Sequence, residues 1–72
     1  MDWNEKMKNL TPRERQICAL LRDKPDLTRR GVGNQIGVSY HTVSFHLRGV
    51  YDKLGVSSRP ELVKNLCTEA KG

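Results

Sequence analysis

The amino-acid sequence predicts an all-α fold, a compact four-helix domain built around a central helix-turn-helix. The segment 27–54 divides into two helical stretches joined by the turn Gly37-Val38-Ser39, and a three-residue turn with a glycine is typical of a helix-turn-helix. Apolar residues after this turn recur at intervals of four, three and four residues, which places them on one helical face. No segment gives the signal of a strand, so the prediction contains helices alone.

Length and charge narrow the classes of function. Seventy-two residues form one small domain with a thin core, in which an enzyme cleft between elements is not expected. Thirteen Lys and Arg residues against eight Asp and Glu residues leave a net charge of +5, which favours nucleic acid or another acidic partner. Many small basic proteins bind nothing specific, so the charge alone does not decide. The sequence has no carboxylate cluster or nucleophile–base pair that would predict catalysis.

The cysteines and the hydropathy predict the compartment and the cofactors. Cys18 and Cys67 are far apart in apolar helical settings, which predicts reduced, buried thiols and a cytoplasmic protein. Together with His41 and His46 they lack the spacing of zinc ligands, so no metal and no other cofactor is expected. No apolar run is long enough for a membrane span or a signal peptide.

Residues 1–9 precede the domain, which is assigned to residues 10–70. They form a frayed arm, a short extra turn or helix, or the remnant of a linker to an upstream domain, and the sequence leaves these three readings open. Trp3 and Met7 are four residues apart, so one helical turn could dock both on the body of the domain.

A helix from about Pro12 to Asp23 has a strong start signal. Thr11 is its N-cap, Pro12 suits its first position, and Glu14 at the third position can complete a capping box. Pro25 cannot continue the helix and therefore ends it. The core face comprises Ile17, Cys18, Leu20 and Leu21. The solvated face, parts of which could lie near phosphates, comprises Arg13, Arg15 and Arg22.

The next helix begins after Thr28 as N-cap and directs Val32 and Ile36 inward. Gly31 and Gly33 lie inside it, and each costs about 0.5–1 kcal/mol relative to alanine. Gly33 allows close packing against the following helix, whereas Gly31 has no evident gain. This helix is therefore expected to be the weakest of the set.

The third helix of the domain runs from about Tyr40 to Leu54, with Ser39 as its N-cap. Gly37 before it and Gly55 after it can adopt the left-handed conformation that ends helices. Its core-facing stripe comprises Val43, Leu47, Val50 and Leu54.

A last helix is predicted from about Arg59 to Ala70, capped by Ser57 or Ser58, with Pro60 near its start and Glu61 in its first turn. Its apolar stripe comprises Leu62, Val63, Leu66 and Cys67.

The face of the third helix opposite its apolar stripe carries His41, Ser44, Phe45, Arg48 and Asp52. Most of these could bind a partner by hydrogen bonding or charge, but Phe45 is a large aromatic residue pointing away from the core. It either packs on a neighbouring loop or helix, or belongs to a surface that a partner buries.

This helix meets the requirements for reading base edges in the major groove, which admits one α-helix. Arg48 is the candidate for bidentate hydrogen bonding to guanine O6 and N7. Ser44 and His41 can donate or accept, and Phe45 could contact a thymine methyl.

Phosphate contacts are expected around this face. The amide groups at the two helix N-termini capped by Thr28 and Ser39 can bind anions. The flanking candidates are Arg29, Arg30, Tyr40, Thr42, His46 and Lys53. His46 borders the apolar stripe and could instead be a packed, neutral histidine, and the two arginines could simply be solvated.

Several motifs resemble one known family in their order and spacing. They are Leu10-Thr11-Pro12-Arg13-Glu14-Arg15, Gly37-Val38-Ser39, Thr42-Val43, His46, Lys53-Leu54-Gly55-Val56, and Ser58-Arg59 with Glu61-Leu62-Val63. Together they are similar to the LuxR/GerE-type DNA-binding domain, also called the FixJ or NarL type, over about Leu10 to Leu66. The resemblance implies a transcription regulator, or the DNA-binding domain of one, with base-facing residues at Ser44, Phe45 and Arg48.

The resemblance also implies phosphate-facing roles for Thr42, His46 and Lys53. It implies a homodimer on a two-fold operator of double-stranded DNA, because one copy contacts too few bases and two copies need half-sites about one turn apart. The expected interface on the last helix comprises Pro60, Val63, Lys64 and Cys67. Val63 and Cys67 could instead be wholly intramolecular. An upstream receiver or ligand-binding domain, or RNA polymerase, is a further implied partner.

The sequence departs from the family pattern at three places. The link around Pro25 is longer and lacks glycine, Gly31 and Gly33 replace the usual Glu and Ala, and Ser44 replaces a longer polar residue such as Lys. Ser44 reaches fewer base atoms, which predicts a different sequence preference or a lower affinity. Ser44, Phe45 and the glycines Gly31 and Gly33 keep an alternative function open, a protein-interaction module of the same fold that sequesters or modulates a related regulator. The basic charge and the intact helix caps argue against that alternative.

Overall fold

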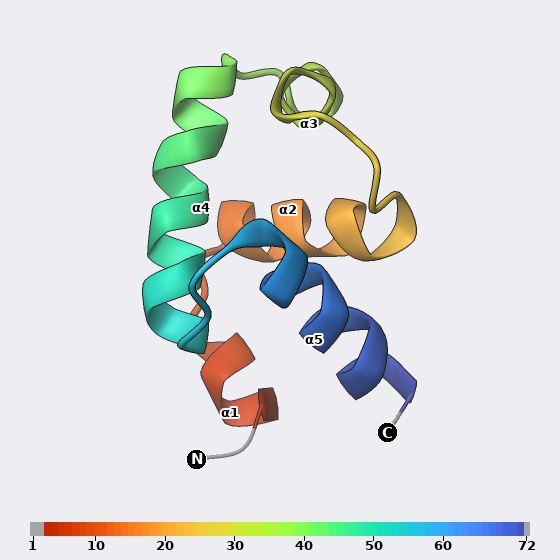
Figure 1. The fold of residues 1–72 in the computed structure, drawn as a ribbon. Coiled ribbons are helices and arrows are strands. Elements are labelled where there is room, and N and C mark those ends of the chain that lie inside the picture. The colour runs from red at the N-terminus through yellow and green to blue at the C-terminus, as the bar shows by residue number, and fades with distance from the viewer. Residues whose placement is uncertain (1–2, 72) are drawn as a thin grey trace.

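The computed structural model describes residues 3–71, and it describes the side chains of these residues except residues 4 and 69–71. Within this range the chain forms five helices and no strand (Figure 1). The helices are α1 (Trp3–Lys8), α2 (Pro12–Asp23), α3 (Arg29–Ile36), α4 (Tyr40–Leu54) and α5 (Arg59–Lys71). The predicted all-α class is confirmed, and the extra N-terminal helix that the sequence left open is present.

The longest helix, α4, is the element against which the others assemble. It packs against α3, α2 and α1, while α5 packs against α2. Figure 1 shows α4 along one side of the molecule, with α3 beside its N-terminal end and α1 just beyond its C-terminal end. The predicted apolar stripe of α4 is fully enclosed, because Val43, Leu47, Val50 and Leu54 are each at most 2% exposed. The residues that meet this stripe in the core include Ile17, Leu21, Val32 and Leu62.

The helix caps form as the sequence predicts. The Thr11 hydroxyl accepts from the Glu14 N–H at 3.2 Å, and the Glu14 carboxylate accepts from the Thr11 N–H at 2.8 Å, which completes the capping box. The hydroxyl of Thr28 caps α3 and that of Ser39 caps α4. Helix α5 begins at Arg59, so Ser58 occupies the cap position, where its carbonyl accepts the Leu62 N–H.

Two turns require glycine because of their backbone conformation. Gly37 has φ 76° after α3, and Gly55 has φ 70° after α4, as predicted for residues that end a helix. Gly33 serves another purpose. A Cβ atom at this position would overlap the carbonyl oxygen of Val38, so only glycine lets α3 lie directly against the turn. At Gly31 a Cβ atom would instead lie 2.6 Å from a side-chain methyl of Leu27. The sequence offered no reason for a glycine here, and this close neighbour supplies one.

Two arginines tie the link before α3 and the end of α3 to the rest of the domain. Arg59 donates from Nη2 to the carbonyl of Pro25 at 3.1 Å and also to the carbonyl of Leu27. Arg13 donates to the Ile36 carbonyl at 3.0 Å, at the C-terminal end of α3. Arg13 was expected on a solvated face, and its side chain is exposed but anchored. These hydrogen bonds satisfy backbone carbonyls that have no partner within a helix.

Helix α1 docks through the two residues that the sequence pairs. Trp3 and Met7 are half-buried and pack against the core cluster, close to the C-terminal end of α4. In residues 3–71 no helix has the length and apolar character needed to cross a bilayer.

Candidate nucleic-acid interface

The outward face of α4 is open over most of its length. His41, Arg48 and Asp52 are exposed, and Ser44 is half-buried beside them. Phe45 is 73% exposed, so it does not pack on a neighbouring loop or helix. The first of the two alternatives for this residue is therefore wrong. The five residues that the helical spacing placed together therefore share one accessible surface.

A hollow of about 430 Å³ lies beside this face, between α4 and the start of α2. Its lining residues are Glu14, Phe45, Arg48, Gly49, Asp52 and Lys53. The phenyl ring of Phe45 stands at 64° to the His46 ring, with 5.8 Å between the ring centroids. His46 is half-buried, so this edge contact gives the exposed ring a fixed neighbour.

A basic and aromatic corner forms where α3 meets the start of α4. The Arg30 guanidinium lies 5.2 Å from the centroid of the Tyr40 ring, within cation–π range, and the Tyr40 and His41 centroids are 4.1 Å apart. A hollow of about 350 Å³ opens here, lined by Arg30, Asn34, Val38, Ser39 and Tyr40. The structure therefore brings Arg30, Ser39, Tyr40 and His41 together.

The remaining phosphate candidates lie in three places. Thr42 Oγ1 is 3.2 Å from Ser39 Oγ, within the same cap, and Thr28 caps α3 from an exposed position. Arg29 is exposed on α3. Lys53 stands apart from this corner, at the C-terminal end of α4.

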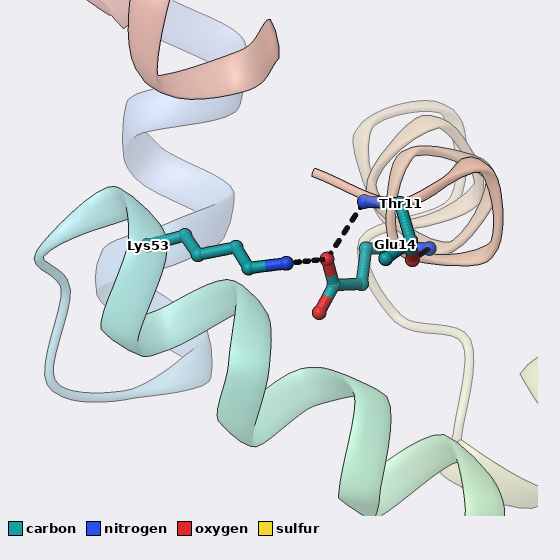
Figure 2. Close-up of polar contacts among 3 residues, drawn as sticks. All are labelled: Thr11, Glu14 and Lys53. Carbon is teal, nitrogen blue, oxygen red and sulfur yellow. Dashed lines mark hydrogen bonds and ion pairs between the residues drawn. The ribbon is translucent and has the colours of Figure 1, made fainter. Parts of the chain in front are cut away.

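Lys53 forms an ion pair that the sequence reasoning missed. Its Nζ atom lies 2.8 Å from Oε1 of Glu14, and the same oxygen accepts the Thr11 N–H at 2.8 Å, as Figure 2 shows. The Glu14 side chain is 7% exposed and that of Lys53 is 35% exposed. One carboxylate therefore joins the N-terminus of α2 to the last turn of α4.

The ion pair changes the titration of Glu14. Burial raises the pKa of this carboxyl, but the hydrogen bonds from Lys53 and Thr11 and the charge of Lys53 outweigh burial, so the pKa lies below its usual value. A Cβ atom at Gly49 would overlap Oε2 of Glu14, so a glycine at this point of α4 lets the carboxylate lie against the helix. The sequence signal that could have indicated this contact is Gly49, because a glycine in the middle of a helix is unfavourable unless a close neighbour requires it.

The two cysteines differ in their surroundings. Cys18 is buried, and burial together with the nearby Glu14 charge raises the pKa of its thiol to about 11. Cys67 is half-buried on α5, so the prediction of a buried thiol is right for Cys18 and wrong for Cys67. Both are free thiols. On α5, Pro60 and Lys64 are exposed, and Val63 is half-buried against the core.

Comparisons with known proteins identify the family. Residues 8–66 match the family described as bacterial regulatory proteins, luxR family. The chain is 39% identical over 56 residues to the probable transcriptional regulatory protein SgaR of Hyphomicrobium methylovorum, which covers 78% of this chain and 26% of that protein. It is 40% identical over 55 residues to the putative HTH-type transcriptional regulator Mb0914c of Mycobacterium bovis, covering 76% of this chain and 6% of that protein.

The chain thus spans only 26% and 6% of the length of these two curated relatives. No solved structure matches it. The family match covers α2, α3, α4 and most of α5, which are the helices that carry the caps, the glycine turn and the exposed face described above. This chain belongs to the luxR family of bacterial regulatory proteins.

Proposed function

We propose that this chain binds double-stranded DNA as a transcription regulator, or as the DNA-binding domain of one, by placing α4 in the major groove. The observation that carries the proposal is the two-sided character of α4. Its apolar stripe is enclosed in the core, while Phe45 and Arg48 stand exposed on the opposite face. A rigid helix with hydrogen-bonding groups on its free side suits base edges in the groove. Arg48 reads guanine, and Ser44 and His41 add shorter contacts.

The corner at the start of α4 suits the DNA backbone. Arg30 and Tyr40 are stacked there, and the α4 N-terminus presents amide groups beside Ser39 and Thr42. Further phosphate contacts come from Thr28, Arg29, His46 and Lys53. The ammonium group of Lys53 has three donors, so it can hold Glu14 and still donate to a phosphate.

Specificity needs two copies of the domain on DNA. A dimer doubles the base contacts and binds half-sites about one helical turn apart. The proposed contact surface is the outward side of α5, where Pro60 and Lys64 are exposed and Val63 and Cys67 are half-buried. In the cell we expect a cytoplasmic protein that works with an upstream receiver or ligand-binding domain, or with RNA polymerase, and that catalyses no reaction.

Selection of bound sequences from a random duplex pool tests the proposal. Enrichment of a near-palindrome with half-sites about one turn apart is the expected result. Binding of the enriched duplex should weaken steeply as salt is raised, because phosphate contacts release counterions. Absence of binding at low salt would contradict the proposal and favour the sequestering module, whose protein partner would bind with little salt dependence.

A pair of variants tests which residues read bases. Arg48→Ala should weaken binding to the enriched duplex by about 1–3 kcal/mol and relax the preference at one base pair. Lys53→Ala should weaken binding to all sequences about equally. Unchanged affinity and unchanged selected sequence for Arg48→Ala would show that another face of the domain meets DNA.

A further inference from the structure

Phe45 is an exposed apolar side chain that hydrogen-bonding contacts do not explain. Among the described residues, the exposed large hydrophobic side chains are Phe45, at 73%, and Tyr40, at 39%. Tyr40 contacts both Arg30 and His41, whereas Phe45 contacts the ring of His46 at one edge. A phenyl ring has no hydrogen-bonding group, so in the middle of a binding face it gains free energy mainly by burial against an apolar partner.

The major groove offers one apolar group at the base edges, the methyl on C5 of a pyrimidine. The N and O atoms presented there are hydrogen-bond donors or acceptors, which a phenyl ring would desolvate without compensation. Thymine carries this methyl, and 5-methylcytosine carries the same group at the same position. The net charge of +5 and the neighbouring Arg48 suit the phosphate-rich duplex that would present it.

Arg48 lies one turn along α4 from Phe45, and both line the hollow of about 430 Å³. A helix rises about 1.5 Å per residue, so the two residues are about 4.5 Å apart along its axis, close to the step of about 3.4 Å between base pairs. Side chains at this spacing share one face and can contact neighbouring base pairs. Ser44 beside them is short, so it leaves the ring room to reach the groove floor.

From this arrangement we propose that Phe45 and Arg48 together read a C5-methylated pyrimidine next to a guanine. Phe45 packs on the methyl group, and Arg48 donates to O6 and N7 of the guanine in the adjacent pair. The inference rests on the proposed function, because it assumes that α4 enters the groove. It adds the chemical group that this chain recognises, which the exposure of Phe45 indicates.

Base analogues in the enriched duplex test the inference. Replacing each thymine by deoxyuridine removes only the C5 methyl and should weaken wild-type binding about four-fold for one buried methyl and about fifteen-fold for two half-sites. Replacing the same thymine·adenine pair by cytosine·guanine, with and without a C5 methyl on the cytosine, distinguishes the sources. If the methyl itself is recognised, 5-methylcytosine binds more tightly than cytosine by a similar factor.

Variants assign the effect to the two side chains. Phe45→Ala should bind the thymine and deoxyuridine duplexes with equal affinity, while Phe45→Leu should keep part of the difference. Tyr40→Ala is the matched control, because it removes the other exposed aromatic side chain. As a proposed backbone contact, Tyr40 should affect both duplexes alike, so its loss should leave the thymine-to-uridine ratio unchanged. For the guanine, 7-deazaguanine removes N7 and should weaken the wild type but not Arg48→Ala.

The outcomes separate the inference from the proposed function. Wild-type binding that is sequence-specific but equal for thymine and deoxyuridine would overturn the inference and leave DNA recognition by α4 in place. A ratio retained by Phe45→Ala would also overturn it. If the wild type enriches no sequence, both the specific regulator function and the inference fail.

Discussion

The two ends of α4 are stabilised in different ways. At the C-terminal end, Lys53 is bonded to Glu14, whose carboxylate is almost fully enclosed and also holds the start of α2. At the N-terminal end the contacts come from nearby in the chain, because Ser39 caps its own helix, Tyr40 contacts its neighbour His41, and Arg30 of the preceding helix lies over the Tyr40 ring. The tertiary ion pair joins the last turn of α4 to the start of α2. The local contacts leave the first turns of the helix exposed to a partner.

This difference teaches how a small domain can be both rigid and accessible. A core of this size supplies limited stability, so the enclosed Glu14 carboxylate, which completes the capping box and also meets Lys53, contributes a sizeable share of it. The proposed base-reading side chains, Phe45 and Arg48, take no part in that ion pair. The comparison predicts that substitution of Glu14 changes folding first, and that substitutions near Phe45 change binding alone.

The largest effect is expected at Glu14. Glu14→Ala removes the partner of Lys53 and the acceptor of the Thr11 N–H, so the free energy of unfolding should fall by about 2–3 kcal/mol. Urea denaturation followed by circular dichroism measures it. Lys53→Ala, which keeps the capping box, is the control and should cost less than about 1 kcal/mol, since Lys53 is partly exposed. Equal losses for both variants would show that the ion pair, rather than the cap, supplies the stability.

The packing of α3 against the turn should come next. Gly33→Ala introduces a Cβ that overlaps the Val38 carbonyl, and overpacking of this kind costs about 1–3 kcal/mol, offset by about 0.5–1 kcal/mol of helix propensity. Gly31→Ala is the matched control, because its neighbour is the flexible Leu27 side chain and it should be close to neutral. Thermal melting of both variants measures the difference. A Gly33→Ala variant as stable as Gly31→Ala would mean that the turn can move away.

Acid should remove part of the Glu14 contribution. The pKa of Glu14 is lower in the folded state, so its stabilisation is complete above the ordinary glutamate pKa of about 4.3 and is lost as the pH falls through the folded-state value. The difference in unfolding free energy between the wild type and Glu14→Gln should therefore be constant near neutral pH and shrink below about pH 4. If the difference in unfolding free energy instead grew on acidification, the pKa of Glu14 would be raised in the folded state, not lowered.

The smallest effect on folding is expected at Phe45. Phe45→Ala removes an exposed ring, so the free energy of unfolding should change by less than about 0.5 kcal/mol. DNA affinity should nevertheless fall, which calorimetric titration with the enriched duplex measures. Loss of stability comparable to that of Glu14→Ala would end the distinction between the two regions of α4.

Local sequence determined most of this fold because its signals act within a few residues. Thr11 and Glu14 are three positions apart, Gly37 sets its own backbone angle, and the stripe from Val43 to Leu54 follows the helical repeat. Helix bounds and core residues could be predicted from these patterns. The same helical spacing predicted the exposed face of α4, because a helix with one enclosed side leaves its other side free.

Tertiary structure alone decided the contacts between distant residues. Glu14 and Lys53 are 39 positions apart, and Arg59 reaches the carbonyl of Pro25 over 34 positions. Long charged side chains at exposed-looking positions carry no periodic signal, since their partners depend on how the helices pack. Packing also decided that α1 forms and docks through Trp3. The sequence by itself therefore determined which faces of the helices are enclosed and which are exposed. Only the assembled helices decided which charged side chains join distant segments and which remain exposed.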